Sequence, residues 1–267
     1  MYPTSLCRRV ACLVAVLCLA TFAPALAGPI SPLYFTMLSG PGFVGELQGS
    51  AVLNLWSQSV GGENAIALPG SVRTMSSGGG AEYTFAGVPT GVTYIGPGFG
   101  NWRDGTTDGA YNYSVDGSMG SSGVYRFSNT WGNPTLLFTT GALFAGITYD
   151  PSNNSLWLSS LTGGIENRSM SGALQFSFNP TSGVALFLAM DYQDGTLWMA
   201  NGASGNPLLQ YSRSGVYLGF DSYPSLPMYP MSGEFPMIQQ GIPEPAAGLL
   251  LASGLAALRV LRRRRQG

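Results

Sequence analysis

A loose repeat of about 40 to 45 residues runs through the middle of the chain, and it limits the possible folds more than any other feature. Residues 153–158 (NNSLWL) match residues 194–199 (DGTLWM), which lie 41 positions later. Residues 108–113 (DGAYNY) lie 45 positions before the first of these, and residues 63–68 (ENAIAL) lie a further 45 positions back. A repeat of this length is typical of folds in which similar small units stack against one another.

Within each copy the residue pattern predicts short β-strands joined by tight turns. Asp-Gly and Asn-Asn pairs favour hairpin turns because these residues tolerate a positive φ. The segment Leu156-Trp157-Leu158 alternates as a strand does. No segment between residues 30 and 220 keeps a helical period. A second marker, an apolar or aromatic residue two positions before an aromatic one, recurs at residues 83–85, 125–127, 174–176 and 209–211.

About four short strands in each repeat predict an all-β fold, a small β-propeller of about five blades. Four full copies and a partial one at residues 33–47, which has the length of two strands, make up the five. We expect these N-terminal strands to complete the last blade and close the ring. A β-sandwich of irregular hairpins is the alternative.

The composition excludes several classes of chemistry. Only 9% of the residues are charged and the chain contains no His, which removes the commonest general base and zinc ligand. The three cysteines, Cys7, Cys12 and Cys18, all lie in the first 27 residues. The rest of the chain therefore has no disulfide, no thiol nucleophile and no thiolate metal site.

The first 27 residues have the features of a secretory signal peptide. Two arginines precede an apolar run at residues 10–19, and Ala25 and Ala27 form the small-x-small pattern that signal peptidase recognises. We expect cleavage before Gly28 and export of the rest of the chain.

Residues 242–267 have three parts. Pro243, Glu244 and Pro245 come first, and the two prolines keep this motif extended. Residues 246–261 are mostly apolar; as a helix they span roughly 24 Å of a hydrocarbon core about 30 Å thick, and snorkelling of an arginine with local thinning covers the difference. The basic cluster favours the cytoplasmic side for this end; it consists of Arg259, Arg262, Arg263, Arg264 and Arg265.

A Pro-Glu-Pro motif, a short apolar helix and a terminal arginine cluster together resemble the PEP-CTERM sorting signal of Gram-negative bacteria. The resemblance covers about residues 242–265. It implies recognition by an exosortase, a membrane-embedded enzyme that processes its substrate near the motif. It also implies a brief stay in the inner membrane through the C-terminal helix, with the main domain in the periplasm. Delivery to the cell surface or the exopolysaccharide matrix follows. The apolar segment departs from the pattern in being short and in carrying Arg259.

These features divide the chain into a signal peptide (1–27), a repeat domain (28–220), a Pro-rich linker (221–241) and a sorting signal (242–267). Residues 28–241 hold twelve acidic and five basic residues, a formal net charge of −7. We expect an acidic surface, which argues against nucleic acid as a partner because such binding rests on cationic contacts to phosphate.

Four tryptophans are candidates for either packing or ligand contact. Trp157 and Trp198 occupy matching positions of the repeat, so we expect them to pack between blades. Trp102 and Trp131 lie in Gly- and Asn-rich loops, where an aromatic ring can stack on the apolar face of a sugar. The latter two are the candidate ligand contacts, with packing of the loops as the alternative.

Calcium is the one cofactor that the acidic residues suggest, and we expect none. Asp104 and Asp108 form a short acidic pair of the kind that holds calcium through oxygen ligands, as do Asp191 and Asp194. Neither pair has the spacing of a full calcium loop, and turn formation explains Asp108 and Asp194 better.

Two functions fit this sequence. The first is a non-enzymatic surface or matrix protein whose propeller binds polysaccharide or another protein. The second is a calcium-assisted propeller enzyme, a lyase or lactonase acting on extracellular material, which requires several Asp, Asn or Glu oxygens to converge on the central axis. We favour the first because the acidic residues form no recognisable catalytic motif.

Overall fold

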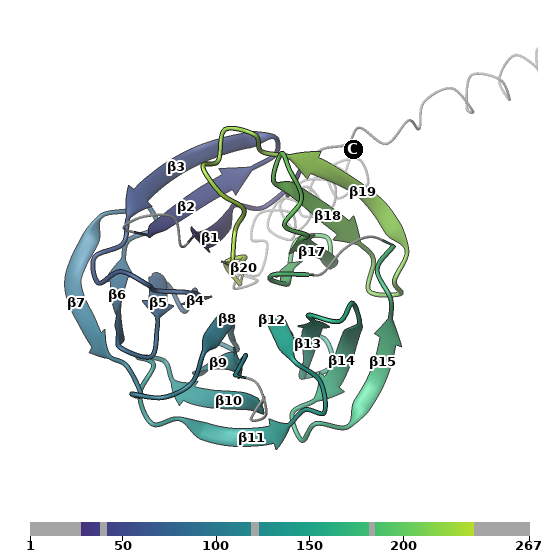
Figure 1. The fold of residues 1–267 in the computed structure, drawn as a ribbon, viewed down its shortest axis with the longest axis horizontal. Helices are drawn as coiled ribbons and strands as arrows, with labels where there is room; N and C mark the ends of the chain where they lie inside the picture. Colours follow the sequence, from purple (N-terminus) through teal and green to yellow (C-terminus); the bar gives the residue numbers. More distant parts are fainter. Residues whose placement is uncertain (1–27, 38–41, 119–122, 182–184, 238–267) are drawn as a thin grey trace, which may run out of the picture. The chain divides into compact units, whose positions relative to one another are not determined.

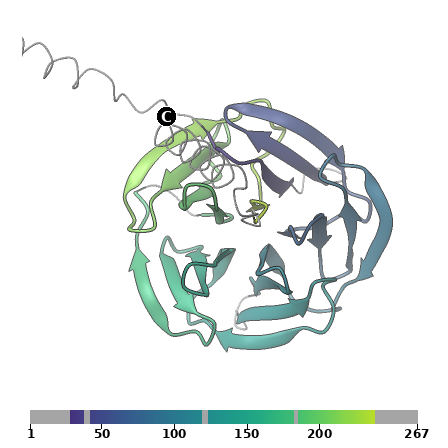
Figure 2. The same cartoon turned by 180° about the vertical axis from the view of Figure 1, so that it is seen from behind.

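The computed structural model describes residues 28–37, 42–118, 123–181 and 185–237. In these residues twenty β-strands and no helix form five four-stranded antiparallel sheets. The sheets stand around a common centre as the blades of a β-propeller (Figure 1), and the view from behind shows the same closed ring (Figure 2). The predicted all-β propeller is confirmed with five blades, and the β-sandwich alternative is wrong.

Four of the blades are each built from one continuous stretch of chain that runs from the innermost strand to the outermost. Blade 2 holds β4 (Ala65–Ala67), β5 (Val72–Met75), β6 (Gly79–Tyr83) and β7 (Pro89–Ile95). Blade 3 holds β8 (Trp102–Thr107), β9 (Tyr111–Asp116), β10 (Gly123–Ser128) and β11 (Thr135–Thr139).

Blade 4 holds β12 (Phe144–Asp150), β13 (Ser155–Ser160), β14 (Ile165–Ser169) and β15 (Leu174–Phe178). Blade 5 holds β16 (Ala189–Asp191), β17 (Thr196–Ala200), β18 (Pro207–Tyr211) and β19 (Tyr217–Ser222).

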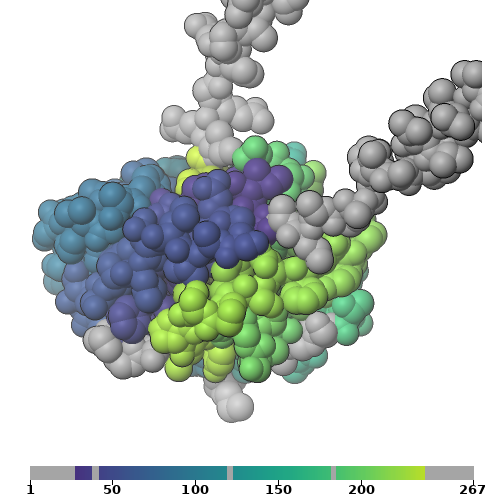
Figure 3. Space-filling view, turned by 90° about the horizontal axis from the view of Figure 1, so that it is seen from above, coloured from purple at the N-terminus to yellow at the C-terminus, as the bar shows by residue number. Residues whose placement is uncertain are grey.

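Blade 1 joins the two ends of the domain. Its outer strands are β1 (Leu33–Met37), β2 (Phe43–Gln48) and β3 (Ala51–Ser57), and its innermost strand is β20 (Ser232–Glu234). β20 pairs antiparallel with β1, with Glu234 opposite Tyr34. In Figure 3 the N-terminal strands, in purple and blue, pack directly against the C-terminal part of the ring, in yellow-green.

This closure corrects two predictions from the sequence. N-terminal strands and a C-terminal strand do share the blade that closes the ring, but the N-terminal part supplies three of its four strands where the sequence suggested two. The repeat domain also does not end at residue 220, because β19 extends to Ser222 and β20 lies within the segment predicted to be a linker. The compact unit that contains the ring reaches Pro236.

The predicted repeat is correct in three of its four copies. Residues 108–109, 153–154 and 194–195 form the hairpin turns between the first two strands of blades 3, 4 and 5. The fourth copy is out of register, since Glu63 and Asn64 come before β4 and the hairpin turn of blade 2 lies at residues 68–71. The second marker begins in the third strand of blades 2, 3 and 5, but residues 174–176 lie in the fourth strand of blade 4.

A turn between the third and fourth strands recurs in blades 2 to 5, and the sequence analysis missed it. A Ser or Thr carbonyl accepts a hydrogen bond from the N–H three residues later, and the same residue's hydroxyl accepts one from the N–H four residues later. The residue three places after the Ser or Thr has a positive φ, between 60° and 87°. The pairs are Thr84 with Gly87, Ser128 with Trp131, Ser169 with Gly172, and Ser212 with Gly215.

Three of these glycines receive an aromatic ring from the outer strand of the blade before. A Cβ atom on the glycine would lie within 2.7 Å of that ring, so only glycine allows the contact. The turn therefore fixes each blade against its neighbour. The contacts are Gly87 on Trp56, Gly172 on Phe138 and Gly215 on Phe178.

We expect Gly172→Ala to lower the free energy of unfolding by about 2–3 kcal/mol, since it adds left-handed strain of roughly 1 kcal/mol to overpacking of about 1–2 kcal/mol against Phe138. The matched control is Gly163→Ala, where φ is +103° but no atom lies within 4 Å of the added Cβ. That variant should lose about 1 kcal/mol. Urea denaturation of both variants measures the difference, and equal losses would contradict the packing role of Gly172.

Trp157 and Trp198 pack between blades, as predicted. Trp198 is 1% exposed in the largest core cluster, which joins blade 5 to Leu33 and Phe35 of blade 1. Trp157 is 3% exposed in a second cluster that joins blades 4 and 5.

Among the described residues, no helix has the length and apolar character needed to cross a membrane. The predicted signal peptide before Gly28 and the predicted helix at residues 246–261 lie outside the described residues.

Candidate functional site

Asp104 lies at the centre of the ring, on the innermost strand of blade 3. It is fully buried, and its carboxylate accepts hydrogen bonds from three other blades. The donors to Oδ2 are the backbone N–H groups of Ile147 at 2.9 Å and Leu188 at 3.0 Å; the donors to Oδ1 are the Gly105 N–H at 2.9 Å, the Ser232 hydroxyl at 2.6 Å and the Gly233 N–H at 3.1 Å.

Glu234 is a second buried carboxylate at the centre, on the closing strand β20. Its Oε1 accepts hydrogen bonds from the Phe235 N–H at 3.0 Å, the Tyr192 hydroxyl at 3.3 Å and the Thr148 hydroxyl at 3.4 Å. Burial raises the pKa of Glu234 well above its ordinary value, and the charge of Asp104 raises it further.

Burial also raises the pKa of Asp104, to about 7, although its hydrogen bonds from Ser232, Leu188 and Ile147 act to lower it. In the described residues, neither axial carboxylate has an ion pair with an arginine. The two groups hold the inner strands of several blades together through hydrogen bonds alone, which is a structural role.

The predicted calcium pair does not form a site. All five hydrogen-bond partners of the Asp104 carboxylate are N–H or O–H donors. Their partly positive hydrogen atoms occupy the positions from which a calcium ion would have to approach the oxygens. Asp108 lies in the β8–β9 turn, where it accepts the N–H of Ala110 at 2.8 Å and that of Tyr111 at 2.7 Å. Within the described ranges, no group of three or more His, Cys, Asp or Glu residues is placed to hold a metal ion.

Asp191 and Asp194 are likewise used separately. Asp191 is buried and accepts hydrogen bonds from the Ser31 N–H at 3.0 Å and the Ser31 hydroxyl at 2.6 Å, which ties the start of the domain to blade 5. Asp194 is exposed and accepts the Thr196 N–H within its hairpin turn. The turn role predicted for Asp194 and Asp108 is confirmed.

The prediction that Trp102 and Trp131 contact a ligand is wrong for this structure, because they are only 2% and 0% exposed. They pack with Phe127 between blades 2 and 3, with ring centroids 5.1 Å and 5.4 Å from that ring. No ring face is left for a sugar. Packing of the loop is correct for Trp131, whereas Trp102 is the first residue of β8 and not a loop residue. The sequence could not reveal this, since Trp131 takes the place that glycine holds in the other turns.

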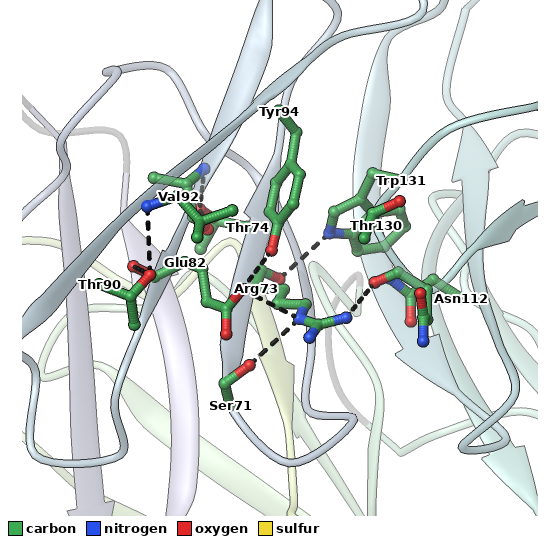
Figure 4. A network of polar contacts seen from close by, with 12 residues as sticks. Ser71, Arg73, Thr74, Glu82, Thr90, Val92, Tyr94, Asn112, Thr130 and Trp131 are labelled. Atoms are coloured by element: carbon green, nitrogen blue, oxygen red, sulfur yellow. Dashed lines mark hydrogen bonds and ion pairs between the residues drawn. The ribbon is translucent and has the colours of Figure 1, made fainter.

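A polar network beside these rings joins the same two blades (Figure 4). The Trp131 indole donates to the Arg73 carbonyl at 3.3 Å, and the Arg73 guanidinium reaches the carboxylate of Glu82 at 3.5 Å. Burial alone would raise the pKa of Glu82, but hydrogen bonds from Tyr94 and Ser71 and the charge of Arg73 hold it below its ordinary value. This network is structural as well.

The acidic charge of the domain lies mostly inside it, which corrects the expectation of an acidic surface. Of the seventeen charged residues between 28 and 237, only Asp194 and Arg213 are exposed. The ten charged residues that are exposed or partly exposed are five acids and five arginines, so the surface lacks the net acidic charge that the sequence predicts. The buried acids are Glu46, Glu63, Asp104, Asp116, Asp150, Asp191 and Glu234.

The outer strands of the five blades form an apolar rim that the sequence analysis also missed. These strands are β3, β7, β11, β15 and β19, and Asp221 is the one charged residue on them. Ten of the sixteen exposed large apolar residues in the described chain lie on these strands. They are Leu53, Leu55, Val92, Ile95, Leu136, Leu174, Phe176, Tyr217, Leu218 and Phe220.

No family model matches the sequence, and no curated protein sequence matches it. Among solved structures, a chain of a nidogen–laminin complex is 13% identical with a TM-score of 0.52, over 76% of this chain and 97% of that one. A protein of unknown function from Bacteroides caccae is 15% identical with a TM-score of 0.48, over 72% of this chain and 73% of that one. At such identities the likeness concerns the fold alone.

Proposed function

We propose that this is an exported protein of the cell surface or extracellular matrix of a Gram-negative bacterium. An exosortase sorts and processes it through the C-terminal signal at residues 242–267, after a stage in the inner membrane. Its propeller is a non-enzymatic binding module for polysaccharide or another protein. The three-part order of the tail supports the sorting, and the signal peptide supports the export.

The observation that carries the binding role is the sparsely charged surface with its apolar rim. Soluble monomers rarely expose large contiguous apolar patches, and those that occur mark interaction sites. Few charges on the surface also reduce the repulsion that keeps proteins apart. Both features suit a protein that works in contact with other matrix components rather than alone in solution.

The alternative, a calcium-assisted lyase or lactonase, has one observation in its favour. Asp104 and Glu234 do converge on the central axis, as such an enzyme requires. They are 0% and 1% exposed, however, and every contact of Asp104 is to a hydrogen-bond donor. A substrate cannot reach them in this structure, so the binding module is favoured.

Expression of the full chain in a host with and without its exosortase tests the sorting. We expect a shortened form at the surface or in the medium when the enzyme is present, and a full-length membrane-bound form when it is absent. Glu244→Ala should give the membrane-bound form in both strains, because it removes the one charged residue of the extended motif. A full-length membrane-bound wild-type chain in both strains would contradict the proposal.

A further inference from the structure

The rim is most apolar where blades 4 and 5 meet. Six large apolar residues there are between 41% and 57% exposed, and we call them the rim patch. They lie on β15 and on β19 with the residue before it. The members are Leu174, Phe176, Val216, Tyr217, Leu218 and Phe220.

A chain of aromatic rings links the two strands of the rim patch beneath the surface, through the buried Tyr211. Phe176 on β15 lies 6.3 Å from Phe178, which lies 5.6 Å from Tyr211, which in turn lies 5.4 Å from Tyr217 on β19. Phe178 also rests on Gly215 of blade 5. The exposed side chains on the two strands are thus held on one rigid support.

The exposed area and the low charge of the rim patch suit an interface between two copies of this chain. Six large side chains about half exposed present roughly 600 Å², compared with about 800 Å² that each partner contributes to a standard interface. β15 carries no charge, and the exposed Arg213 beside the patch is paired with Asp150 at 3.3 Å and with Ser152 at 2.8 Å. Asp221 is the one charged residue on β19, and its Oδ2 atom is buried. Two copies that bring identical patches together therefore meet little like-charge repulsion.

The outer strands do not favour open-ended strand pairing. The pairing of β15 with β14 shifts register at Asn167/Arg168, and that of β19 with β18 shifts at Gln210/Tyr211. Such bulges bend an edge strand and interrupt its hydrogen-bonding row, which limits addition of another strand. Contact through side chains remains possible, and a two-fold arrangement of one patch on itself closes after two copies.

We propose that the rim patch is a self-association surface through which two copies of this protein pair side by side. The pairing rests on the fold and the surface and does not depend on the sorting signal. It is stronger where copies are concentrated, because the area is smaller than that of a permanent dimer.

Cysteine cross-linking in the full chain tests the pairing, since residues 28–267 contain no cysteine. Ser177→Cys places one thiol at the exposed edge of β15, and Ala110→Cys places one on the β8–β9 turn of blade 3 as the matched control. We expect a short bismaleimide to give a product of twice the chain mass for Ser177→Cys and little or none for Ala110→Cys. The parent chain reports any product from the three N-terminal cysteines.

Charge in the patch should prevent the cross-link. Phe176→Glu combined with Ser177→Cys is expected to reduce the yield of the double-mass product about tenfold or more, since carboxylates buried in an apolar contact repel each other. Phe176 also touches Trp157, so Val216→Glu at the most exposed position of the patch serves as a second variant less able to disturb the fold.

Three results would overturn the proposal. One is equal yields from Ser177→Cys and Ala110→Cys. Another is a product of some other mass, which would assign the patch to a different protein. The third is a Ser177→Cys thiol shielded from reagent without any double-mass product, which would point to an occupant such as polysaccharide. Failure of the sorting test would leave all three outcomes unchanged, so the two proposals can be told apart.

Discussion

A chain that ends at Pro230 is expected to show no cooperative unfolding transition. The truncation removes β20, which pairs with β1 through three residues and supplies two of the donors to Asp104. It also removes Phe235, which is 0% exposed in the largest core cluster. Loss of a buried Phe alone costs about 3–5 kcal/mol. The unpaired edge of β1 and the unpaired carboxylate oxygen of Asp104 add further losses, so the total is comparable with the roughly 5–15 kcal/mol that stabilises a domain.

The matched control is a chain that ends at Met237, which lacks the predicted sorting signal but keeps β20. We expect this chain to unfold in one transition when followed by circular dichroism against urea. Thermal melting of the two chains under identical conditions makes the same comparison. A cooperative transition of equal midpoint in the shorter chain would show that β20 does not close the ring.

Asp104→Asn is expected to lower the free energy of unfolding by about 3–5 kcal/mol. Above about pH 7, where Asp104 is ionised, the amide nitrogen of Asn is a donor and would face the donors that now surround one carboxylate oxygen, such as the N–H groups of Ile147 and Leu188. The matched control is Asp194→Asn, an exposed turn residue at a position that Asn tolerates, which should change stability by less than about 0.5 kcal/mol. Urea titration of both variants and the wild type measures the losses, and similar values at the two sites would contradict the central role of Asp104.

The same variant should remove part of the pH dependence of stability. Burial raises the pKa of Asp104 from 3.8 to about 7, so between these values the folded chain holds a proton that the unfolded chain has lost. The contribution of Asp104 to the free energy of unfolding is therefore at its full value below about pH 4. It falls as the pH rises toward 7, by up to about 1.4 kcal/mol per pH unit. We expect the difference in stability between wild type and Asp104→Asn to shrink across this window; a constant difference would contradict the shift.

The turns and the repeat length were predictable from sequence because each depends on neighbours in the chain, and the interblade tryptophans because Trp157 and Trp198 occupy matching positions of the repeat. Residues such as Asp194 and Gly195 carry their own turn preference. β20 was not predictable, since Ser232-Gly233-Glu234 has no strand pattern and becomes a strand only beside β1. Asp104 was likewise read as a calcium candidate, because four of its five donors come from residues 43 to 129 positions away.

The candidate surface was missed for a related reason. Outer strands such as β15 (Leu174–Phe178) alternate in sequence much as buried strands do, so the pattern alone does not mark their apolar residues as exposed. Their exposure follows from being fourth in a sheet, and strand order is not written in local sequence. The shift of Trp131 from loop surface to core has the same origin, because only the neighbouring blade buries it.

Under the export that we propose, the closure of blade 1 would set an order of events. Tyr34 would cross the membrane early and wait for Glu234, its partner in β20, which follows 200 residues later. Pairings so distant in sequence form slowly, and until then the inner edge of β1 is open to other chains. Eight residues separate Glu234 from Pro243, so the proposed membrane-held tail would keep each molecule apart from its neighbours until its last strand had docked.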